Sequence, residues 1–95
     1  MAATPLPDVI LYRRDGCHLC DEARAIVQGL LEDRAARGRP AALLRERDVT
    51  TNEDWERQFF ATIPVVEVRG RRLELATSPA KLRRFLDDAL DSSLV

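Results

Sequence analysis

Two cysteines are the side chains of this sequence best suited to covalent chemistry, and they stand three positions apart in Cys17-His18-Leu19-Cys20. In a helix, residues three apart have Cα atoms about 5 Å from each other, within the range of about 4.4–6.8 Å that a disulfide requires. A reversible disulfide therefore needs little backbone movement. A purely structural disulfide explains the pair poorly, because closing so short a loop stabilises a fold by only about 2 kcal/mol.

The place of this motif in the chain distinguishes the two sulfurs. It lies where a predicted strand ends and a predicted helix begins, and the free N–H groups and dipole of a helix N-terminus favour a negative charge. Helix N-termini and C-x-x-C motifs lower a thiol pKa from ~8.5 to about 3.5–7.5. We therefore expect a lowered pKa for Cys17 and interpret it as the nucleophile. Cys20 shares a helix face with Ala23 and Val27, so it should point inward and act as the resolving thiol.

Residues near the motif also affect the pKa expected for Cys17 and the chemistry open to it. Arg13 and Arg14 would stabilise a thiolate, whereas Asp21 and Glu22, one turn into the helix, would oppose it. His18, the only histidine, either tunes or protonates the leaving sulfur or projects into solvent. No metal site is expected within one chain, because a closed zinc site requires four ligands and the motif offers two sulfurs and one imidazole.

Apolar periodicity predicts the elements that position the motif. Residues 9–12 form a continuous apolar run, closed by the turn-forming Asp15-Gly16, which is typical of a central strand buried on both faces. From 17 to about 37, apolar residues recur at the spacing of an amphipathic helix. Residues 42–49 combine leucines with alternating charges and predict a second strand at a sheet edge.

A short helix with aromatic side chains is expected next. Thr51 and Asp54 have the spacing of a capping pair and would open a helix that carries Trp55, Phe59 and Phe60. We interpret this aromatic cluster as core packing.

The last third of the chain predicts a hairpin and a final helix. Residues 64–68 and 72–75 are read as strands joined through Arg69-Gly70-Arg71, and Ser78-Pro79 has the N-cap and N1 chemistry that opens a helix. The resulting order is β-α-β-α-β-β-α. A right-handed βαβ unit followed by a hairpin and a helix makes an α/β protein with a four-stranded mixed sheet and three helices, which is the thioredoxin-like fold.

Length and composition limit the number of domains, the kinds of binding partner and the compartment of this protein. Ninety-five residues make a single domain over 1–95, with 1–7 and 91–95 expected as flexible tails. Fifteen basic against sixteen acidic residues leave a net charge of −1, without the cation excess that binds nucleic acid or anionic membrane. We find neither an export signal nor an apolar run of about 18 residues and expect a cytoplasmic protein. In that compartment cysteines stay reduced unless they turn over.

Two segments, residues 11–20 and the sequence Thr-Ile-Pro-Val at 62–65, carry a resemblance to a known family. Through them the chain resembles the glutaredoxin-like family of the thioredoxin superfamily, over residues 8 to about 90. The resemblance implies the glutaredoxin-type fold and a thiol–disulfide oxidoreductase in which a cis Pro64 lies beside the active cysteine. It also implies that the backbone N–H and C=O groups of Ile63 bind a substrate peptide or glutathione.

The resemblance further suggests partners. Arg14 and His18 join Ile63 and Pro64 as candidate substrate-binding residues. The substrate would be a disulfide in a protein or a small molecule, and glutathione or a thioredoxin-type protein would be the reductant. We expect a monomer with no tightly bound cofactor. The sequence departs from typical glutaredoxins inside the motif, where His-Leu replaces Pro-Tyr, and at residues 75–78, where Leu-Ala-Thr-Ser replaces the Gly-Gly and acid that hold glutathione.

Two alternatives to an oxidoreductase stay open at this point. One is a non-catalytic module that binds zinc or an iron–sulfur cluster on Cys17 of two subunits. The other is a thioredoxin-fold scaffold whose cysteines are vestigial.

Overall fold

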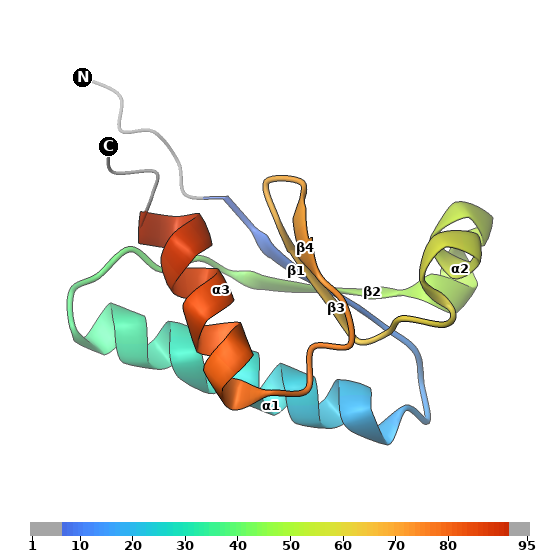
Figure 1. Ribbon diagram of the computed structural model, residues 1–95, viewed down its shortest axis with the longest axis horizontal. Helices are drawn as coiled ribbons and strands as arrows, with labels where there is room; N and C mark the ends of the chain where they lie inside the picture. The colour runs from blue at the N-terminus through green and yellow to red at the C-terminus, as the bar shows by residue number, and fades with distance from the viewer. Residues whose placement is uncertain (1–6, 92–95) are drawn as a thin grey trace.

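The computed structural model describes residues 7–91 and shows, in this part of the chain, a four-stranded mixed sheet with three α-helices (Figure 1). The elements are β1 (Val9–Arg13), α1 (His18–Ala36), β2 (Leu44–Asp48), the 3₁₀ helix η1 (Val49–Thr51), α2 (Glu53–Phe59), β3 (Val65–Val68), β4 (Arg71–Leu73) and α3 (Pro79–Asp91). The β-α-β-α-β-β-α order and the thioredoxin-like fold predicted from the sequence are confirmed.

β1 lies inside the sheet, whose strand order is β2-β1-β3-β4. It runs parallel to β2, with Val9 opposite Leu44, and antiparallel to β3, with Tyr12 opposite Val65. The end of β1 that leads to the cysteine motif is therefore next to the start of β3, which follows Pro64. This register brings the two segments that carry the family resemblance to the same end of the sheet.

Alternate side chains of β1 enter two separate cores. Val9 and Leu11 face α1 and α3, whereas Tyr12 faces η1 and α2. The larger core consists of Val9, Leu11, Ala23, Val27, Leu31, Val66, Val68, Ala76, Leu82, Leu86, Ala89 and Leu90. The smaller core consists of Tyr12, Val49, Phe59 and Val65. Since burial of each valine or leucine contributes roughly 1.5–3 kcal/mol, the larger core fixes α1, and with it the motif, against the sheet.

Helix α2 begins one residue later than the predicted capping pair implies. Asn52, not Thr51, is the N-cap, and its Oδ1 accepts the N–H groups of Asp54 at 2.9 Å and Trp55 at 3.2 Å. Thr51 belongs to η1 and donates its hydroxyl to the Asp48 carbonyl. Thr51 and Asn52 are both residue types that cap helices well. Because Thr51 is the last residue of η1, Asn52 becomes the N-cap of α2.

Two of the three aromatic side chains of this segment join the smaller core. The Phe59 ring centroid lies 4.2 Å from that of Tyr12, and the Trp55 centroid lies 6.0 Å from it. Arg47 donates to the Tyr12 hydroxyl at 3.0 Å and lies over the Trp55 ring. Phe60 is exposed instead, so the interpretation of the whole cluster as core is wrong for this residue.

The hairpin turn is tighter than predicted. Arg69 and Gly70 alone connect the strands, because Arg71 already pairs with Val68. Both turn residues have positive φ, 52° and 81°, as in a type I′ turn, whose twist matches that of the flanking strands. β4 then ends at Leu73, two residues before the predicted end.

Helix α3 begins where the sequence predicts but extends further. Ser78 Oγ accepts the Lys81 N–H at 3.2 Å, and Pro79 is the first helical residue. Asp91, expected in a flexible tail, is the last residue of α3. Residues 1–6 and 92–95 of the two expected tails lie outside the described residues.

A buried arginine joins the last turns of α1 and α3. Arg34 is 4% exposed, and it donates from Nε to the Pro40 carbonyl at 2.6 Å and from Nη1 to Asp87 at 2.7 Å. Its Nη2 pairs with Asp91, which also accepts a hydrogen bond from Arg39 at 2.9 Å. A buried cation requires such partners, because desolvating an unpaired one costs several kcal/mol.

Replacing Arg34 by methionine should lower the free energy of unfolding by about 2–3 kcal/mol, because the Pro40 carbonyl, Asp87 and Asp91 lose the hydrogen bonds that Arg34 donates. Urea denaturation followed by circular dichroism measures this change. Arg37→Met is the matched control: Arg37 is an exposed residue that pairs with Asp33 across one helical turn, so its loss should cost less than about 0.5 kcal/mol. Equal losses in both variants would contradict the role assigned to Arg34.

The same network should make part of the stability depend on pH. The hydrogen bond from Arg34 outweighs the effect of burial and, with the charges of Arg34 and Arg39, lowers the pKa of Asp91. A carboxyl with a lowered pKa stabilises the fold fully above its unfolded pKa of about 3.9, and the contribution is lost as pH falls through the folded value. The stability difference between wild type and Arg34→Met should therefore shrink below about pH 4. A difference that stays constant across this range would show that Asp91 does not contribute.

Candidate active site

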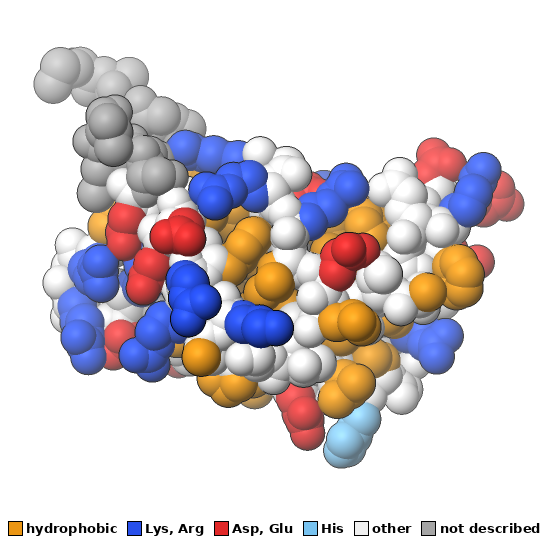
Figure 2. Space-filling model, in the orientation of Figure 1, with side chains coloured by type: hydrophobic (Ala, Val, Ile, Leu, Met, Phe, Trp, Pro, Cys, Tyr) orange, Lys and Arg blue, Asp and Glu red, His pale blue; other side chains and the backbone are white. Residues whose placement is uncertain are grey.

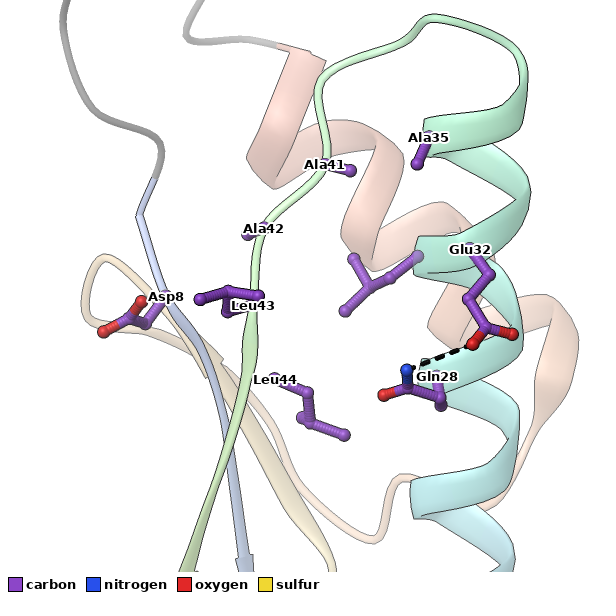
Figure 3. A pocket seen from close by; sticks show the side chains of 9 residues that line it. Asp8, Gln28, Glu32, Ala35, Ala41, Ala42, Leu43 and Leu44 are labelled. Carbon is purple, nitrogen blue, oxygen red and sulfur yellow. Dashed lines mark hydrogen bonds between the residues drawn. The ribbon is translucent and has the colours of Figure 1, made fainter.

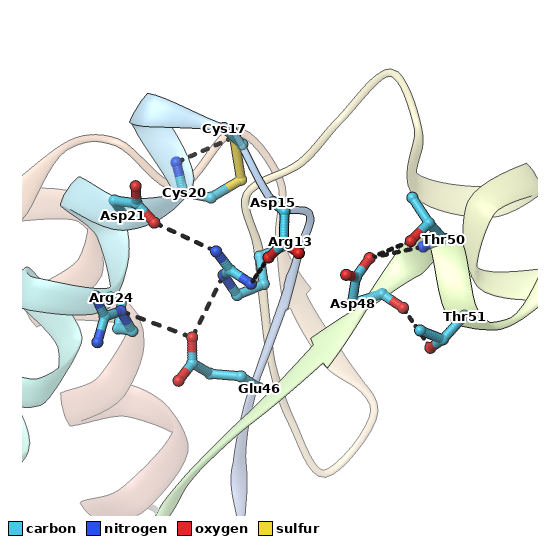
Figure 4. A network of polar contacts seen from close by, with 10 residues as sticks. All are labelled: Arg13, Asp15, Cys17, Cys20, Asp21, Arg24, Glu46, Asp48, Thr50 and Thr51. Atoms are coloured by element: carbon cyan, nitrogen blue, oxygen red, sulfur yellow. Dashed lines mark hydrogen bonds and ion pairs between the residues drawn. A yellow bond between two sulfur atoms is a disulfide. The ribbon is translucent and has the colours of Figure 1, made fainter.

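Cys17 and Cys20 are joined by a disulfide at the start of α1, with Cα atoms 5.2 Å apart. Gly16, with φ of +78°, makes the turn that brings the chain from β1 into the helix. Cys17 is the N-cap: its carbonyl accepts the Asp21 N–H at 3.1 Å, and its Sγ accepts the Cys20 N–H at 3.2 Å (Figure 4). A thiolate on the reduced Cys17 would meet the same N–H donor and the positive end of the helix dipole.

The two sulfurs differ in exposure. Cys17 is half-buried, whereas Cys20 is fully buried, with an exposed fraction of 0%. Cys20 continues the buried face of α1 that includes Ala23 and Val27, as the helical spacing predicts. A reagent in solvent can therefore reach Cys17 but not Cys20.

Next to the disulfide, Arg13 is surrounded by three carboxylates (Figure 4). Its guanidinium lies 3.3 Å from Asp15, 3.3 Å from Asp21 and 3.4 Å from Glu46, which also lies 3.7 Å from Arg24. Burial lowers the pKa of Arg13, but the hydrogen bonds to Asp15 and Asp21 and the charge of Glu46 outweigh it and raise that pKa. The positive charge of Arg13 is thus balanced locally by these three carboxylates.

Glu46 is the member of this network that sequence reasoning missed. The parallel register places Glu46 opposite Leu11, so its side chain faces α1 and lies diagonal to Arg13. The alternating charges of the edge strand are a signal for such pairing. The face on which each charge lies, however, depends on a strand register that tertiary packing selects.

Arg14 and His18, two of the candidate substrate-binding residues, are exposed on either side of Cys17. The Arg14 carbonyl accepts the Cys17 N–H at 3.3 Å. The Arg14 side chain lines an open groove together with Glu56 and Arg57 of α2. His18 is the first residue of α1. Arg14 therefore precedes the reactive pair along the chain, His18 lies between its two cysteines, and the Arg14 side chain lines a surface that it shares with α2.

The Ile63–Pro64 peptide bond is cis, as the resemblance implies, and Pro64 is buried at the start of β3, beside the end of β1. The Ile63 N–H donates to the Phe59 carbonyl at 3.0 Å, directly after the last turn of α2. It is therefore not available to a substrate, which corrects half of the expectation for Ile63. The Ile63 carbonyl accepts no hydrogen bond from residues 7–91 and stays a candidate acceptor.

A second depression lies at the other end of the strands, between α1 and β2 (Figure 3). It is lined by Leu31 and Ala35 of α1 and by residues 41–44, with Gln28 and Glu32 hydrogen-bonded at 3.3 Å. Because β2 begins opposite the start of β1, this depression is separated from the disulfide by the length of the strands.

Metal-binding and membrane-spanning features were sought in the same part of the chain. Among residues 7–91, no three or more His, Cys, Asp or Glu side chains form a group that could hold a metal ion. None of the helices described has the length and apolar character that crossing a bilayer requires.

The fold and the site together define a class of protein. The β2-β1-β3-β4 sheet, the Cys-x-x-Cys pair at the start of the first helix and the cis-proline at the adjacent end of the sheet are features of thioredoxin-like proteins with a redox role. The family described as Glutaredoxin-like domain (DUF836) matches residues 8–92. The chain belongs to this family.

Solved structures are similar over nearly the whole chain. The X-ray structure of XcR50 from X. campestris has a TM-score of 0.68 and 27% identity, over 85% of this chain and 97% of that one. A malarial protein has a TM-score of 0.64 and 17% identity, over 90% and 99% of the two chains. The solution NMR structure of Ne2328 from Nitrosomonas europaea has a TM-score of 0.62 and 20% identity, over 100% and 98%. The last two establish similarity of fold alone, and no curated protein matches the sequence.

Replacing Arg13 by glutamine should raise the pKa of the reduced Cys17 thiol, because Asp15, Asp21 and Glu46 would lose the cation that balances them. Alkylation of the reduced protein by iodoacetamide at neutral pH should slow on the order of threefold. Arg13→Lys keeps the charge and should retain most of the wild-type rate. Unchanged or faster alkylation of Arg13→Gln would show that this network has no electrostatic influence on Cys17.

Proposed function

We propose that this chain is a thiol–disulfide oxidoreductase that uses its two cysteines in turn. The observation that carries the proposal is a half-buried Cys17 at a helix N-terminus, paired at disulfide distance with a fully buried Cys20 one turn along. An accessible sulfur beside a backbone N–H is suited to attack a substrate, and a sheltered neighbour is suited to attack the resulting mixed disulfide.

The proposed reaction transfers two electrons to the substrate. The Cys17 thiolate attacks one sulfur of a substrate disulfide, forms a mixed disulfide and expels the other substrate sulfur as a thiolate. Cys20 loses its proton to solvent and attacks the Cys17 sulfur, which closes the intramolecular disulfide and releases the second substrate sulfur. The substrate leaves as two thiols once its thiolates take protons from solvent.

Four residues are proposed to position the substrate. The Ile63 carbonyl would accept a hydrogen bond from a substrate backbone N–H, and Pro64 would form the wall beside Cys17. Arg14 would pair with a substrate carboxylate, and the exposed His18 would contact groups that approach from solvent. The Ile63 carbonyl is the most direct of these assignments because no residue between 7 and 91 occupies it.

An external reductant would restore the dithiol. We assign this role to glutathione or a thioredoxin-type protein of the cytoplasm, and the oxidising substrate to a disulfide in a protein or a small molecule. The chain would act as a monomer without a tightly bound cofactor.

Single-turnover reaction of the reduced protein with 5,5′-dithiobis(2-nitrobenzoate) tests the assigned roles. The wild type should release two equivalents of nitrothiobenzoate, because Cys20 resolves the first adduct. Cys20→Ser should release one equivalent and keep a mixed disulfide that mass spectrometry detects. Cys17→Ser should react at least about 100-fold more slowly, because burial shields Cys20.

The opposite pattern would contradict the assignment. If Cys17→Ser formed a stable adduct and rapidly released one equivalent of nitrothiobenzoate, Cys20 would be the nucleophile. Wild-type protein that releases no more nitrothiobenzoate than Cys20→Ser would show that the pair does not close a bridge, and the oxidoreductase proposal would be wrong.

A further inference from the structure

A small cavity lies between the last turns of α1 and the middle of α3, at the far end of α1 from Cys17. Its volume is about 160 Å³, below the roughly 300–1,000 Å³ of pockets that hold drug-sized ligands. Leucines and charged side chains line it: Leu30, Asp33, Arg34, Arg37, Arg39, Arg83, Leu86 and Asp87. Figure 2 shows blue and red side chains gathered at the left of the molecule, where α1 ends. A cavity of this size and polarity matches a small ion.

The acidic residues of α3 are paired with arginines from α1 and from the loop after it. Asp87 accepts a hydrogen bond from Arg34 at 2.7 Å, and Asp91 pairs with Arg34 and, at 2.9 Å, with Arg39. Arg83 has thereby lost its nearest partner, because Asp87 lies four residues further along the same helix, the spacing at which helical ion pairs form. In the part of the chain that the structure describes, Arg83 has no hydrogen bond or ion pair.

The cavity carries an excess of positive charge and of unused hydrogen-bond donors. Four arginines line it, against three carboxylates when Asp91 at its edge is counted. Each guanidinium has five N–H donors. Toward residues 7–91, Arg37 uses only Nε, which donates to Asp33 at 3.2 Å, and Arg39 uses only Nη2. Together with Arg83, these side chains present three guanidinium groups with free N–H donors to one cavity.

The end of α1 does not cancel this positive charge. A helix C-terminus carries about half a negative charge on its last carbonyls, which disfavours an anion. Here backbone N–H groups occupy carbonyls of the last turn: Gly38 donates to Ala35 at 3.1 Å, and Arg39 donates to Arg34 at 2.9 Å. The excess of one full positive charge therefore exceeds the helix dipole.

We propose that this cavity binds a phosphate-type dianion, held by Arg37 and Arg39 on one side and by Arg83 of α3 on the other. A guanidinium group donates two parallel N–H bonds to the oxygens of a phosphate, and three such groups need more acceptor oxygens than the two of a carboxylate. A tetrahedral oxyanion supplies them. The site goes beyond the proposed function, since neither cysteine takes part in it, and its ligand is either free phosphate or the phosphoryl group of a small molecule.

NMR titration of the oxidised, isotope-labelled protein with sodium phosphate tests the site, at an ionic strength kept constant with sodium chloride. Saturable shifts are expected in the Nε–H signals of Arg37, Arg39 and Arg83. Arg83→Gln should raise the Kd for phosphate at least about tenfold, because it removes a charged donor from the anion. Since Arg83 is exposed and unpaired, this variant should keep the wild-type circular dichroism spectrum.

Arg84→Gln is the matched control. Arg84 is the next residue of α3, is exposed, has no ion pair within residues 7–91 and does not line the cavity. Its replacement removes the same charge and should change the Kd by less than about twofold, because exposed charges outside the site are screened. Arg37→Met, on the facing helix, should weaken binding as Arg83→Gln does and provides a second, independent variant.

Three further anions define the ligand. Sulfate should compete with phosphate, whereas acetate at the same concentration should not. Glucose 6-phosphate binding as tightly as phosphate would identify the phosphoryl group of a small molecule, and its failure to bind would identify the free ion.

The site would be overturned by phosphate shifts that do not saturate, by equal weakening in Arg83→Gln and Arg84→Gln, or by a Kd unchanged in both Arg83→Gln and Arg37→Met. None of these results would affect the oxidoreductase proposal, which rests on the cysteines at the other end of α1.

Discussion

A backbone N–H directed at a sulfur is the interaction on which the site depends. At the start of most helices an oxygen of serine, threonine or aspartate accepts such an N–H group, and here the Sγ of Cys17 does so. The first turn of α1 therefore has its own structural reason to hold a cysteine at the N-cap. Because sulfur binds these donors more strongly as an anion, the same geometry that caps the helix also favours the reactive form of the thiol.

The sheet contributes the second half of the site. Since β1 is paired with a parallel neighbour on one side and an antiparallel one on the other, its C-terminal end lies between the end of β2 and the start of β3. The charges on β2 meet Arg13 there, and the cis-proline segment arrives from β3. The electrostatic balance beside Cys17 and the position of the cis-proline segment are thus both consequences of strand order.

Much of this arrangement was predictable from the sequence because it rests on local patterns. Apolar spacing predicts α1 and its buried Cys20, and Ser78 with Pro79 predicts the start of α3. The pairing of Arg34 with Asp91 was not predictable, because the two residues are 57 positions apart and only tertiary packing brings them together. The same holds for Glu46, whose role follows from register. The exposure of Phe60 was also missed, since an aromatic residue in a short helix is indistinguishable by type from its buried neighbour Phe59.

The buried Arg34 has a consequence for how this protein can change over evolution. It anchors α1 seventeen residues after Cys17, about 26 Å along the helix axis, which is several times the distance over which charges are screened at physiological salt. Substitutions near Arg34 that change thermal stability should therefore have almost no electrostatic effect on Cys17. Selection can therefore alter the stability of the fold and the surroundings of Cys17 through separate sets of residues on one helix.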